Sequence, residues 1–353
     1  HKQYDAPLES DIETVARNVS NWIRTCPSTE HVGEDAAEAI AVAQKAPAQI
    51  STLILPADVS WGEGGTAVDL IPEQVTKNAS DTIITQIADV LLKQGKKTAL
   101  LLGRRVLMEE GLIAASKLAE KTGAKLFAEV FPTRLERGAG LPNVERIAYL
   151  AEMATVQLTG YDNLVIIDTK EPISFFAYPG KKSYLVPEGC TVHNLVEPHQ
   201  DALGSLHALV STVGAEATEP KLQQANRPKL PSGKLNAAKV CQAIGALMPD
   251  NAIISDEAQT SGVKLPAFTA GAPRHDLLTL TGGAIGQGLP VSFGAAMAGT
   301  NRPNISLVGD GSAIYTIQSL LPLVKDTLDV TIIALNNRST AILNHQHERV
   351  GAK

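Results

Sequence analysis

Gly309-Asp310-Gly311-Ser312 and Asn336-Asn337 are the two stretches of this 353-residue sequence that decide its fold. The first follows the apolar run 305–308 and the second follows the apolar run 330–335, so each stands where a predicted strand ends. In open α/β folds the carboxyl ends of neighbouring parallel strands form one edge of the sheet, and ligands bind there. The pattern therefore predicts that these polar residues lie together at such an edge.

A divalent metal and a diphosphate are the ligands that this predicted edge suits. Asp310 and Asn337 carry oxygen donors, and proteins hold Mg²⁺ with few side-chain oxygens together with water and phosphate oxygens. Gly311 lets backbone N–H groups come close to phosphate oxygens. The alternative is that Gly-Asp-Gly forms a tight turn and Asn-Asn a strand-end turn, as these residue types commonly do.

Helical and strand-like stretches alternate along the rest of the chain, which predicts the α/β class with parallel sheets flanked by helices. Clustered glycine and proline mark linkers at 62–77 and 215–234, and these separate segments 1–61, 78–214 and 235–353. The predicted helices are 11–22, 36–46, 82–93, 108–121, 144–157, 202–213, 237–247 and 286–298, and the predicted strands are 51–55, 98–102, 125–130, 164–168, 184–187, 252–255, 305–308 and 330–335.

Composition excludes several classes of protein. A net charge of −6 with scattered basic residues argues against nucleic-acid binding. No apolar run approaches the roughly 18 residues of a membrane span, so no membrane segment is expected. The three cysteines, Cys26, Cys190 and Cys241, lie far apart and outside any CxxC pair, which fits a reduced, cytoplasmic compartment.

The GDG-to-NN pair resembles the thiamine diphosphate fingerprint, in which the metal-binding Asp and the second Asn are 27 positions apart, as Asp310 and Asn337 are. Residues 280–290 (LTGGAIGQGLP) also resemble the family segment beneath the aminopyrimidine ring of the cofactor. The segment order is similar to that of the three-domain enzymes of the acetolactate synthase and benzoylformate decarboxylase group. Within that group, 134–142 and 338–351 look most like large-subunit acetolactate synthase homologues.

This resemblance implies an identity for each segment. Residues 1–61 would be the C-terminal half of a pyrimidine-binding domain, 78–214 a central Rossmann-like domain, and 235–353 part of a diphosphate-binding domain. The three-domain architecture would then be incomplete at both ends. The glutamate that protonates the pyrimidine ring in the family has no counterpart in the sequence, so no catalytic acid is assigned and we expect this stretch alone to be inactive.

Individual site residues are also implied by the resemblance. Asp310 and Asn337, with the backbone carbonyl of Ser339, would hold Mg²⁺, while Gly311 and Ser312 would offer N–H groups to the diphosphate. The other implied cofactor contacts come from two further segments, with Glu257, Gln259 and Thr260 near the outer phosphate, the Gly283 carbonyl at the aminopyrimidine and Ile285 beneath the bent cofactor. The alternatives are a polar helix cap for the first three and an ordinary core isoleucine for Ile285.

Histidines are the remaining catalytic candidates because imidazole titrates near neutrality. His275 precedes the cofactor segment and could face the site, with a structural role as the alternative. His1 is a weaker candidate. His345 and His347 would share one face of a strand but not of a helix.

The implied activity is thiamine diphosphate- and Mg²⁺-dependent decarboxylation and carboligation of 2-oxo acids, as acetolactate synthase converts two pyruvates into acetolactate and CO₂. Three alternatives are a benzoylformate decarboxylase-like enzyme, a non-catalytic thiamine diphosphate-binding homologue, and a flavin- or nucleotide-binding oxidoreductase component. The strand end at 101–104 carries no GxGxxG, so a central domain without FAD is preferred. By analogy, a homodimer or homotetramer is expected.

Overall fold

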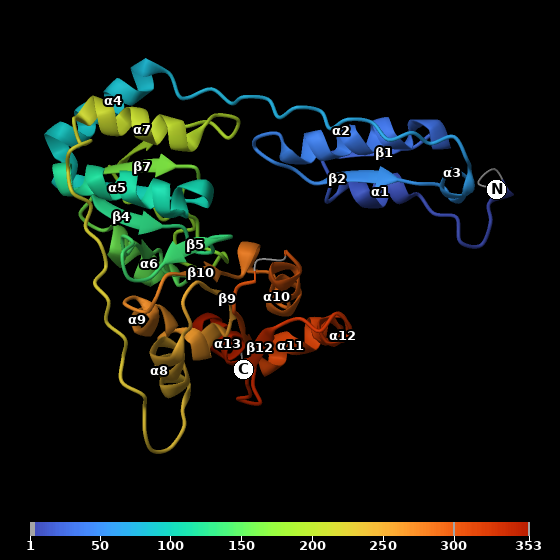
Figure 1. The fold of residues 1–353 in the computed structure, drawn as a ribbon. Helices are drawn as coiled ribbons and strands as arrows, with labels where there is room; N and C mark the ends of the chain where they lie inside the picture. The colour runs from blue at the N-terminus through green and yellow to red at the C-terminus, as the bar shows by residue number, and fades with distance from the viewer. Residues whose placement is uncertain (1–3, 299–300, 352–353) are drawn as a thin grey trace. The chain divides into compact units, whose positions relative to one another are not determined.

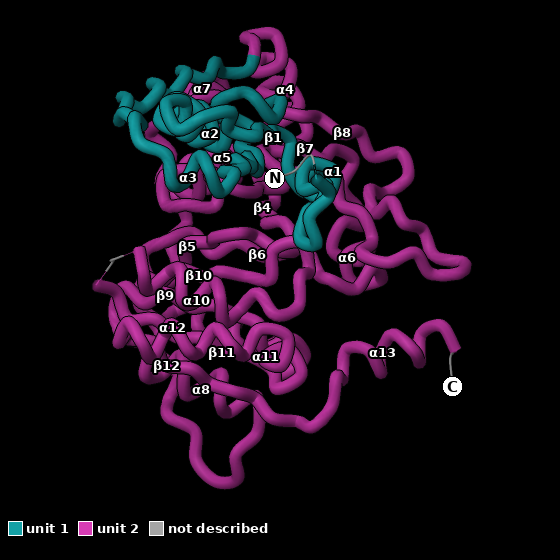
Figure 2. Tube along the Cα trace, turned by 90° about the vertical axis from the view of Figure 1, so that its right-hand side faces the viewer, with its two compact units in different colours: residues 1–79, 196–201 teal, residues 80–195, 202–353 magenta. Residues whose placement is uncertain are grey.

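The computed structural model describes residues 4–298 and 301–351 (Figure 1). The chain divides into two compact units, His1–Ala79 with Val196–Asp201 and Ser80–Leu195 with Ala202–Lys353 (Figure 2). Within the described residues, no helix combines the length and the apolar character needed to cross a bilayer. His1, the weaker catalytic candidate, lies outside the described residues.

Unit 1 is built around two parallel strands, β1 (Trp22–Thr25) and β2 (Ser51–Ile54). Its helices are α1 (Ile12–Arg17), α2 (Val32–Gln44) and α3 (Ala57–Trp61). The prediction of one helix over 11–22 was wrong, because the chain leaves the helix after Arg17 and Trp22 begins a strand. The Ser20 hydroxyl donates to the carbonyl oxygens of Trp22 and Ile50, which ties the start of β1 to the residue before β2.

Unit 2 contains a first sheet of five parallel strands in the order β6-β4-β3-β7-β8. The strands are β3 (Thr98–Leu102), β4 (Lys125–Ala128), β6 (Glu145–Arg146), β7 (Asn163–Ile167) and β8 (Thr191–Asn194). The helices are α4 (Asp81–Gln94), α5 (Glu109–Thr122), α6 (Ala151–Leu158) and α7 (Ala202–Val213). Every residue of β3 and β7 is buried, as expected for central strands covered on both faces.

Two predicted elements of this sheet were wrong. The helix expected over 144–157 begins only at Ala151, because the Ile147 N–H donates to the Ala128 carbonyl and extends the pairing of β6 with β4. The strand expected over 184–187 is reduced to a single bridge between Tyr184 and Ile173. The edge strand is instead β8, which pairs with β7 along its whole length.

The second sheet of unit 2 has the order β12-β11-β9-β10-β5. Its parallel strands are β9 (Ala252–Glu257), β10 (His275–Leu278), β11 (Asn304–Gly309) and β12 (Val330–Leu335), and its antiparallel edge is β5 (Leu135–Arg137). The helices are α8 (Ala237–Leu247), α9 (Leu265–Thr269), α10 (Gly288–Met297), α11 (Asp310–Thr316), α12 (Leu320–Lys325) and α13 (Ala341–Val350). The strands predicted before the two deciding motifs are confirmed as β11 and β12.

Strand β5 joins the two sheets, and the sequence did not predict this. It comes from the chain between β4 and β6 of the first sheet but pairs with β10 of the second. The carboxylate of buried Asp276 in β10 accepts a hydrogen bond from Arg134 Nε at 3.1 Å and one from an Arg302 guanidinium nitrogen at 2.5 Å. At Gly138, where φ is +114°, an added Cβ would lie 2.5 Å from the Pro273 carbonyl oxygen, so this turn favours glycine. These contacts hold both sheets in one compact unit.

Candidate functional site

The candidate site lies at the carboxyl edge of β9, β11 and β12. In the register of this sheet Gly309 pairs with Leu335 and Val308 with Glu257, so the chain leaves the three strands side by side. A cavity of about 80 Å³ opens there. Eight of the residues expected from the sequence line it, namely Gln259, Thr260, Ile285, Asp310, Gly311, Ser312, Asn337 and Ser339.

The expected metal ligands come together in the turn after β12. Asp310 Oδ2 accepts the Arg338 N–H at 3.0 Å, and Asn337 Oδ1 accepts the Ser339 N–H at 3.0 Å. Arg338 has a φ of +55°, which turns the chain back toward Asp310. In the described part of the chain, Asp310 Oδ1 has no hydrogen-bond partner. A carboxylate, an amide and a nearby carbonyl form an all-oxygen donor set, and such a set fits Mg²⁺.

Gly311 and Ser312 begin α11 beside this turn. A Cβ at Gly311 would lie 3.3 Å from Thr340 Oγ1, so the missing side chain allows the close approach of the segment after β12. The Ser312 side chain is buried and hydrogen-bonds to Glu257. Its backbone N–H, rather than its hydroxyl, is therefore the group that could donate a hydrogen bond to a phosphate oxygen.

Glu257 has the capping role that the sequence left as an alternative. Its buried carboxylate accepts the backbone N–H groups of Gly286 at 2.5 Å and Gly288 at 2.6 Å, at the start of α10. It does not line the cavity. Burial raises the pKa of Glu257, and the hydrogen bonds from the two glycines and Ser312 oppose that rise.

Ile285 directly precedes Gly286, the first of the two glycines that Glu257 holds. Its exposed fraction is 37% and it lines the cavity, so it is not an ordinary core isoleucine. Gly283 does not line the cavity. It has a φ of +70°, and an added Cβ there would be 2.3 Å from the Phe175 ring, so both backbone and space favour glycine.

His275 lies at the opposite end of the sheet. It pairs with Ala252, the first residue of β9, whereas the cavity follows the last residue of that strand. The side chain is buried, with an exposed fraction of 3%. Its Nδ1 lies 2.7 Å from the Pro273 carbonyl, and burial lowers its pKa to about 4. The geometry therefore gives His275 a structural position. His345 and His347 lie on α13 and so point in different directions.

A second cavity, of about 760 Å³, adjoins the first and was not predicted. It shares Gln259, Thr260 and Ile342 with the small cavity. Its other walls include Arg146, Tyr149 and Met153 from the first-sheet segment and His345 and Arg349 from α13. These residues are up to about 200 positions apart in sequence, and no local pattern reports such a convergence.

Comparison with known proteins places this geometry in a family. Residues 256–353, which contain both deciding motifs, match the model described as "Thiamine pyrophosphate enzyme, C-terminal TPP binding domain". Over 352 residues the sequence is 48% identical to IlvX of Mycobacterium tuberculosis, a protein provisionally named an acetolactate synthase large subunit. The alignment covers 100% of this chain and 67% of IlvX. The chain belongs to the thiamine diphosphate-dependent enzymes.

Other members of the family are similar over part of the chain or in fold. The Escherichia coli acetolactate synthase isozyme 1 large subunit is 33% identical over 141 residues, 40% of this chain and 24% of that protein. The solved 4-hydroxybenzoylformate decarboxylase of Rhodococcus jostii superposes with a TM-score of 0.77 at 20% identity, covering 99% of this chain and 69% of that one. The expected fold class of this thiamine diphosphate enzyme, parallel sheets flanked by helices, is thereby confirmed.

Proposed function

We propose that the intact protein uses thiamine diphosphate and Mg²⁺ to decarboxylate 2-oxo acids and to join the product to a second carbonyl, in the manner of acetolactate synthase, and that the present stretch alone is inactive. The observation that carries the proposal is the convergence of Asp310, Asn337 and Ser339 with Gly311 in one cavity. Bound thiamine diphosphate would supply a carbon nucleophile and an electron sink for the pair released with CO₂.

The residues of the cavity divide the work of holding the cofactor. Asp310 and Asn337 would give oxygen ligands to Mg²⁺, and the Gly311 and Ser312 N–H groups would bind the diphosphate. Ile285 would support the organic part of the cofactor from below. Glu257 would act indirectly, because its hydrogen bonds to Gly286 and Gly288 position the neighbouring Ile285.

Thermal denaturation with Mg²⁺, with and without thiamine diphosphate, tests this proposal. A ligand that binds only the folded state raises the melting temperature. We expect a rise that Asp310→Ala abolishes and that Asp326→Ala, at the end of α12, leaves unchanged. A folded protein that shows no rise with the cofactor would refute the assignment.

The products of turnover by the full-length enzyme distinguish the enzymatic alternatives. CO₂ with acetolactate from pyruvate would support the acetolactate synthase-like reaction, and CO₂ with benzaldehyde from benzoylformate would support the decarboxylase alternative. Cofactor binding without either product would favour a non-catalytic homologue. The names of the relatives support the first reading, since IlvX and the Escherichia coli protein are both described as acetolactate synthase large subunits.

We further propose that the first sheet of unit 2 holds no FAD. Its carboxyl edge carries Glu129, which accepts the Arg104 N–H at 3.2 Å and the Thr169 hydroxyl at 2.9 Å. Asp168 lies there too, 3.6 Å from an Arg104 guanidinium nitrogen. Carboxylates at this edge would repel a dinucleotide diphosphate, which normally meets a glycine-rich turn. A visible flavin spectrum in the purified protein would contradict this.

A homodimer or homotetramer remains part of the proposal. Helices α11 and α12 and the turn between them expose large apolar side chains that a second copy could cover, Ile314, Tyr315, Ile317, Leu321 and Val324. We expect sedimentation to show an oligomer and Leu321→Lys to shift it toward the monomer. Leu247→Lys, at an exposed position on α8, serves as the control.

A further inference from the structure

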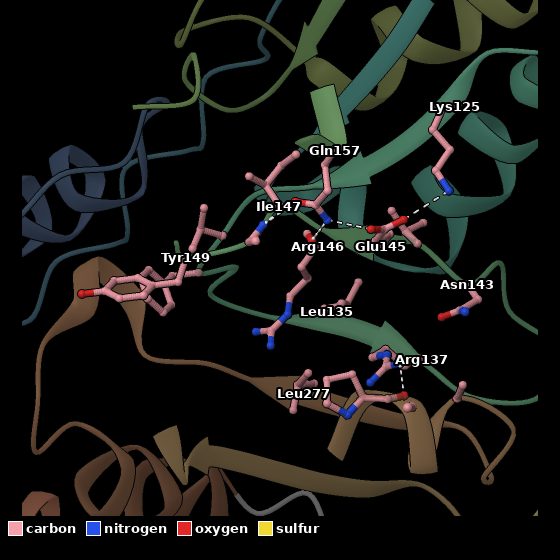
Figure 3. A pocket seen from close by; sticks show the side chains of 17 residues that line it. Lys125, Leu135, Arg137, Asn143, Glu145, Arg146, Ile147, Tyr149, Gln157 and Leu277 are labelled. Atoms are coloured by element: carbon pink, nitrogen blue, oxygen red, sulfur yellow. Dashed lines mark hydrogen bonds and ion pairs between the residues drawn. The ribbon is translucent and has the colours of Figure 1, made fainter. Parts of the chain in front are cut away.

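A cavity of about 540 Å³ is lined by two arginines, Arg137 and Arg146, that have no acidic partner in contact among the residues that the structure describes (Figure 3). It lies between the β6 segment of the first sheet and β5 and α9 beside the second. Arg146 extends from its strand toward Leu135 and Leu277, and Arg137 lies below it in the view. The cavity shares no lining residue with the small cavity at Asp310.

The hydrogen bonds of the two arginines leave their charges uncompensated. Arg137 is 7% exposed and donates to Thr269 Oγ1 at 3.2 Å and to the Pro266 carbonyl at 2.8 Å, both neutral acceptors. Over the described ranges 4–298 and 301–351, the Arg146 guanidinium has no hydrogen bond or ion pair, and Arg137 has no ion pair. An arginine removed from water is normally paired with an anion.

The electrostatics agree with this description. Burial, together with the positive charge of Arg146, lowers the pKa of Arg137 to about 10, against the opposing effect of Asp256. Burial also lowers the pKa of Arg146, while Asp256 acts in the opposite direction through space. The Asp256 carboxylate accepts the Ala258 N–H at 3.1 Å and contacts neither arginine in an ion pair. When ionised it offsets one of the two positive charges, so about one remains.

The walls indicate what else the ligand must have. Apolar and aromatic side chains, Phe131, Leu135, Tyr149 and Leu277, line the cavity beside the arginines. At the rim, Lys125 is 3.3 Å from Glu145, whose other oxygen accepts Gln157 Nε2 at 2.6 Å. The rim charges are thus satisfied by each other, and Arg146 stays available. The volume is that of an ordinary small-molecule site.

We propose that this cavity binds a small organic carboxylate with an apolar body, held by the guanidinium fork of Arg146 and by the charge of Arg137. The two oxygens of a carboxylate can bind the guanidinium group of Arg146 in a bidentate way. Its single negative charge balances the one positive charge that remains in the cavity. The site is separate from the thiamine diphosphate cavity. Arg146 also lines the 760 Å³ cavity, which shares Gln259, Thr260 and Ile342 with the small cavity.

Thermal denaturation without thiamine diphosphate or Mg²⁺ tests the site, with benzoate as the probe and benzamide as its neutral isostere. At a benzoate concentration far above the dissociation constant we expect the melting temperature to rise by a few degrees, and benzamide to leave it unchanged. Arg146→Gln should abolish the rise. Arg105→Gln, at an exposed arginine of the same unit, should keep it. A rise that persists in Arg146→Gln, or an equal rise with benzamide, would overturn the proposal.

Two further measurements keep the test decisive. Arg146→Gln should melt higher than the wild type without ligand, because it removes one of two repelling charges. Arg146→Lys keeps the charge but loses the fork, so calorimetry should show benzoate binding weakened by about tenfold or more. An unchanged affinity of Arg146→Lys for benzoate would refute bidentate binding by the Arg146 guanidinium. Inorganic phosphate acting as strongly as benzoate would show that the apolar walls play no part and would refute the ligand class.

Discussion

The carboxylate of Glu257 accepts the backbone N–H of Gly288, with 2.6 Å between Oε2 and N. Its other oxygen accepts the Gly286 N–H, so both ends of a three-residue segment are tied to the end of β9. An added Cβ at Gly288 would lie 2.7 Å from Glu257 Oε2, which shows how closely the two approach. Glu257, which lies outside the cavity, thus positions segment 286–288, and this segment directly follows the cavity-lining residue Ile285.

Glu257→Ala should destabilise the protein and weaken cofactor binding together. Two backbone N–H groups would lose their acceptor, which costs about 2 to 4 kcal/mol of unfolding free energy. Urea denaturation measures that loss, and calorimetry measures the affinity for thiamine diphosphate. Glu188→Ala, at a side chain that is 90% exposed, is the control. An affinity that does not fall in a folded Glu257→Ala protein would contradict the positioning role.

Ile285→Ala should weaken thiamine diphosphate binding while leaving stability almost unchanged. The side chain is partly exposed in the cavity, so its removal loses little buried area on folding. The contact with the cofactor would be lost, which corresponds to an affinity change on the order of tenfold. Leu247→Ala, an exposed apolar residue on α8, should change neither quantity. A large loss of stability in Ile285→Ala would indicate a core role instead.

His275 should make the protein less stable as the pH falls from 6.5 to about 4. Burial holds the pKa of His275 at about 4 in the folded state, below its ordinary value of 6.5. Within this window the unfolded chain binds a proton that the folded chain excludes, so stability rises with pH. The contribution is at most about 3 kcal/mol.

Urea denaturation across this pH range tests the effect. His275→Asn should flatten the dependence, since its amide can still donate to the Pro273 carbonyl in place of Nδ1. The same slope in His275→Asn as in the wild type would show that other groups cause it.

Asp276→Asn should lower the free energy of unfolding by about 3 to 5 kcal/mol. The Asp276 side chain is only 5% exposed and pairs with both Arg134 and Arg302, so its loss leaves Arg302 without its counter-charge and Arg134 with Glu136 alone. Asp89→Asn, in an exposed pair with Lys93, should change stability by less than about 1 kcal/mol. Equal effects of the two substitutions would mean that the pairs at Asp276 contribute no more than a surface ion pair.

Much of the second sheet could be predicted from local sequence. The runs 305–308 and 330–335 are apolar and end in polar residues, so strand identity and the common edge followed from pattern alone. Strands β5 and β10 escaped prediction because each is short and has no alternation of its own. Strand β5 exists through its pairing with β10, across more than a hundred residues of chain, and β10 is held between β5 and β9.

The site shows the same division. Residues near the two deciding motifs could be named from the sequence because strand ends bring them together in any parallel sheet. The capping of Gly286 and Gly288 by Glu257 depends on the depth at which β9 ends, which spacing does not report. The position of His275 likewise depends on which end of β10 it occupies.

The sequence by itself determined the α/β class and the cluster at Asp310 and Asn337, because apolar periodicity and strand-end chemistry are local properties. Only the tertiary structure decided that Arg137 and Arg146 face one cavity, since they belong to different sheets. Charge and burial arise from such long-range packing, and a linear pattern records neither. The physical reason is that a side chain's environment is set by the residues that fold against it, whatever their distance along the chain.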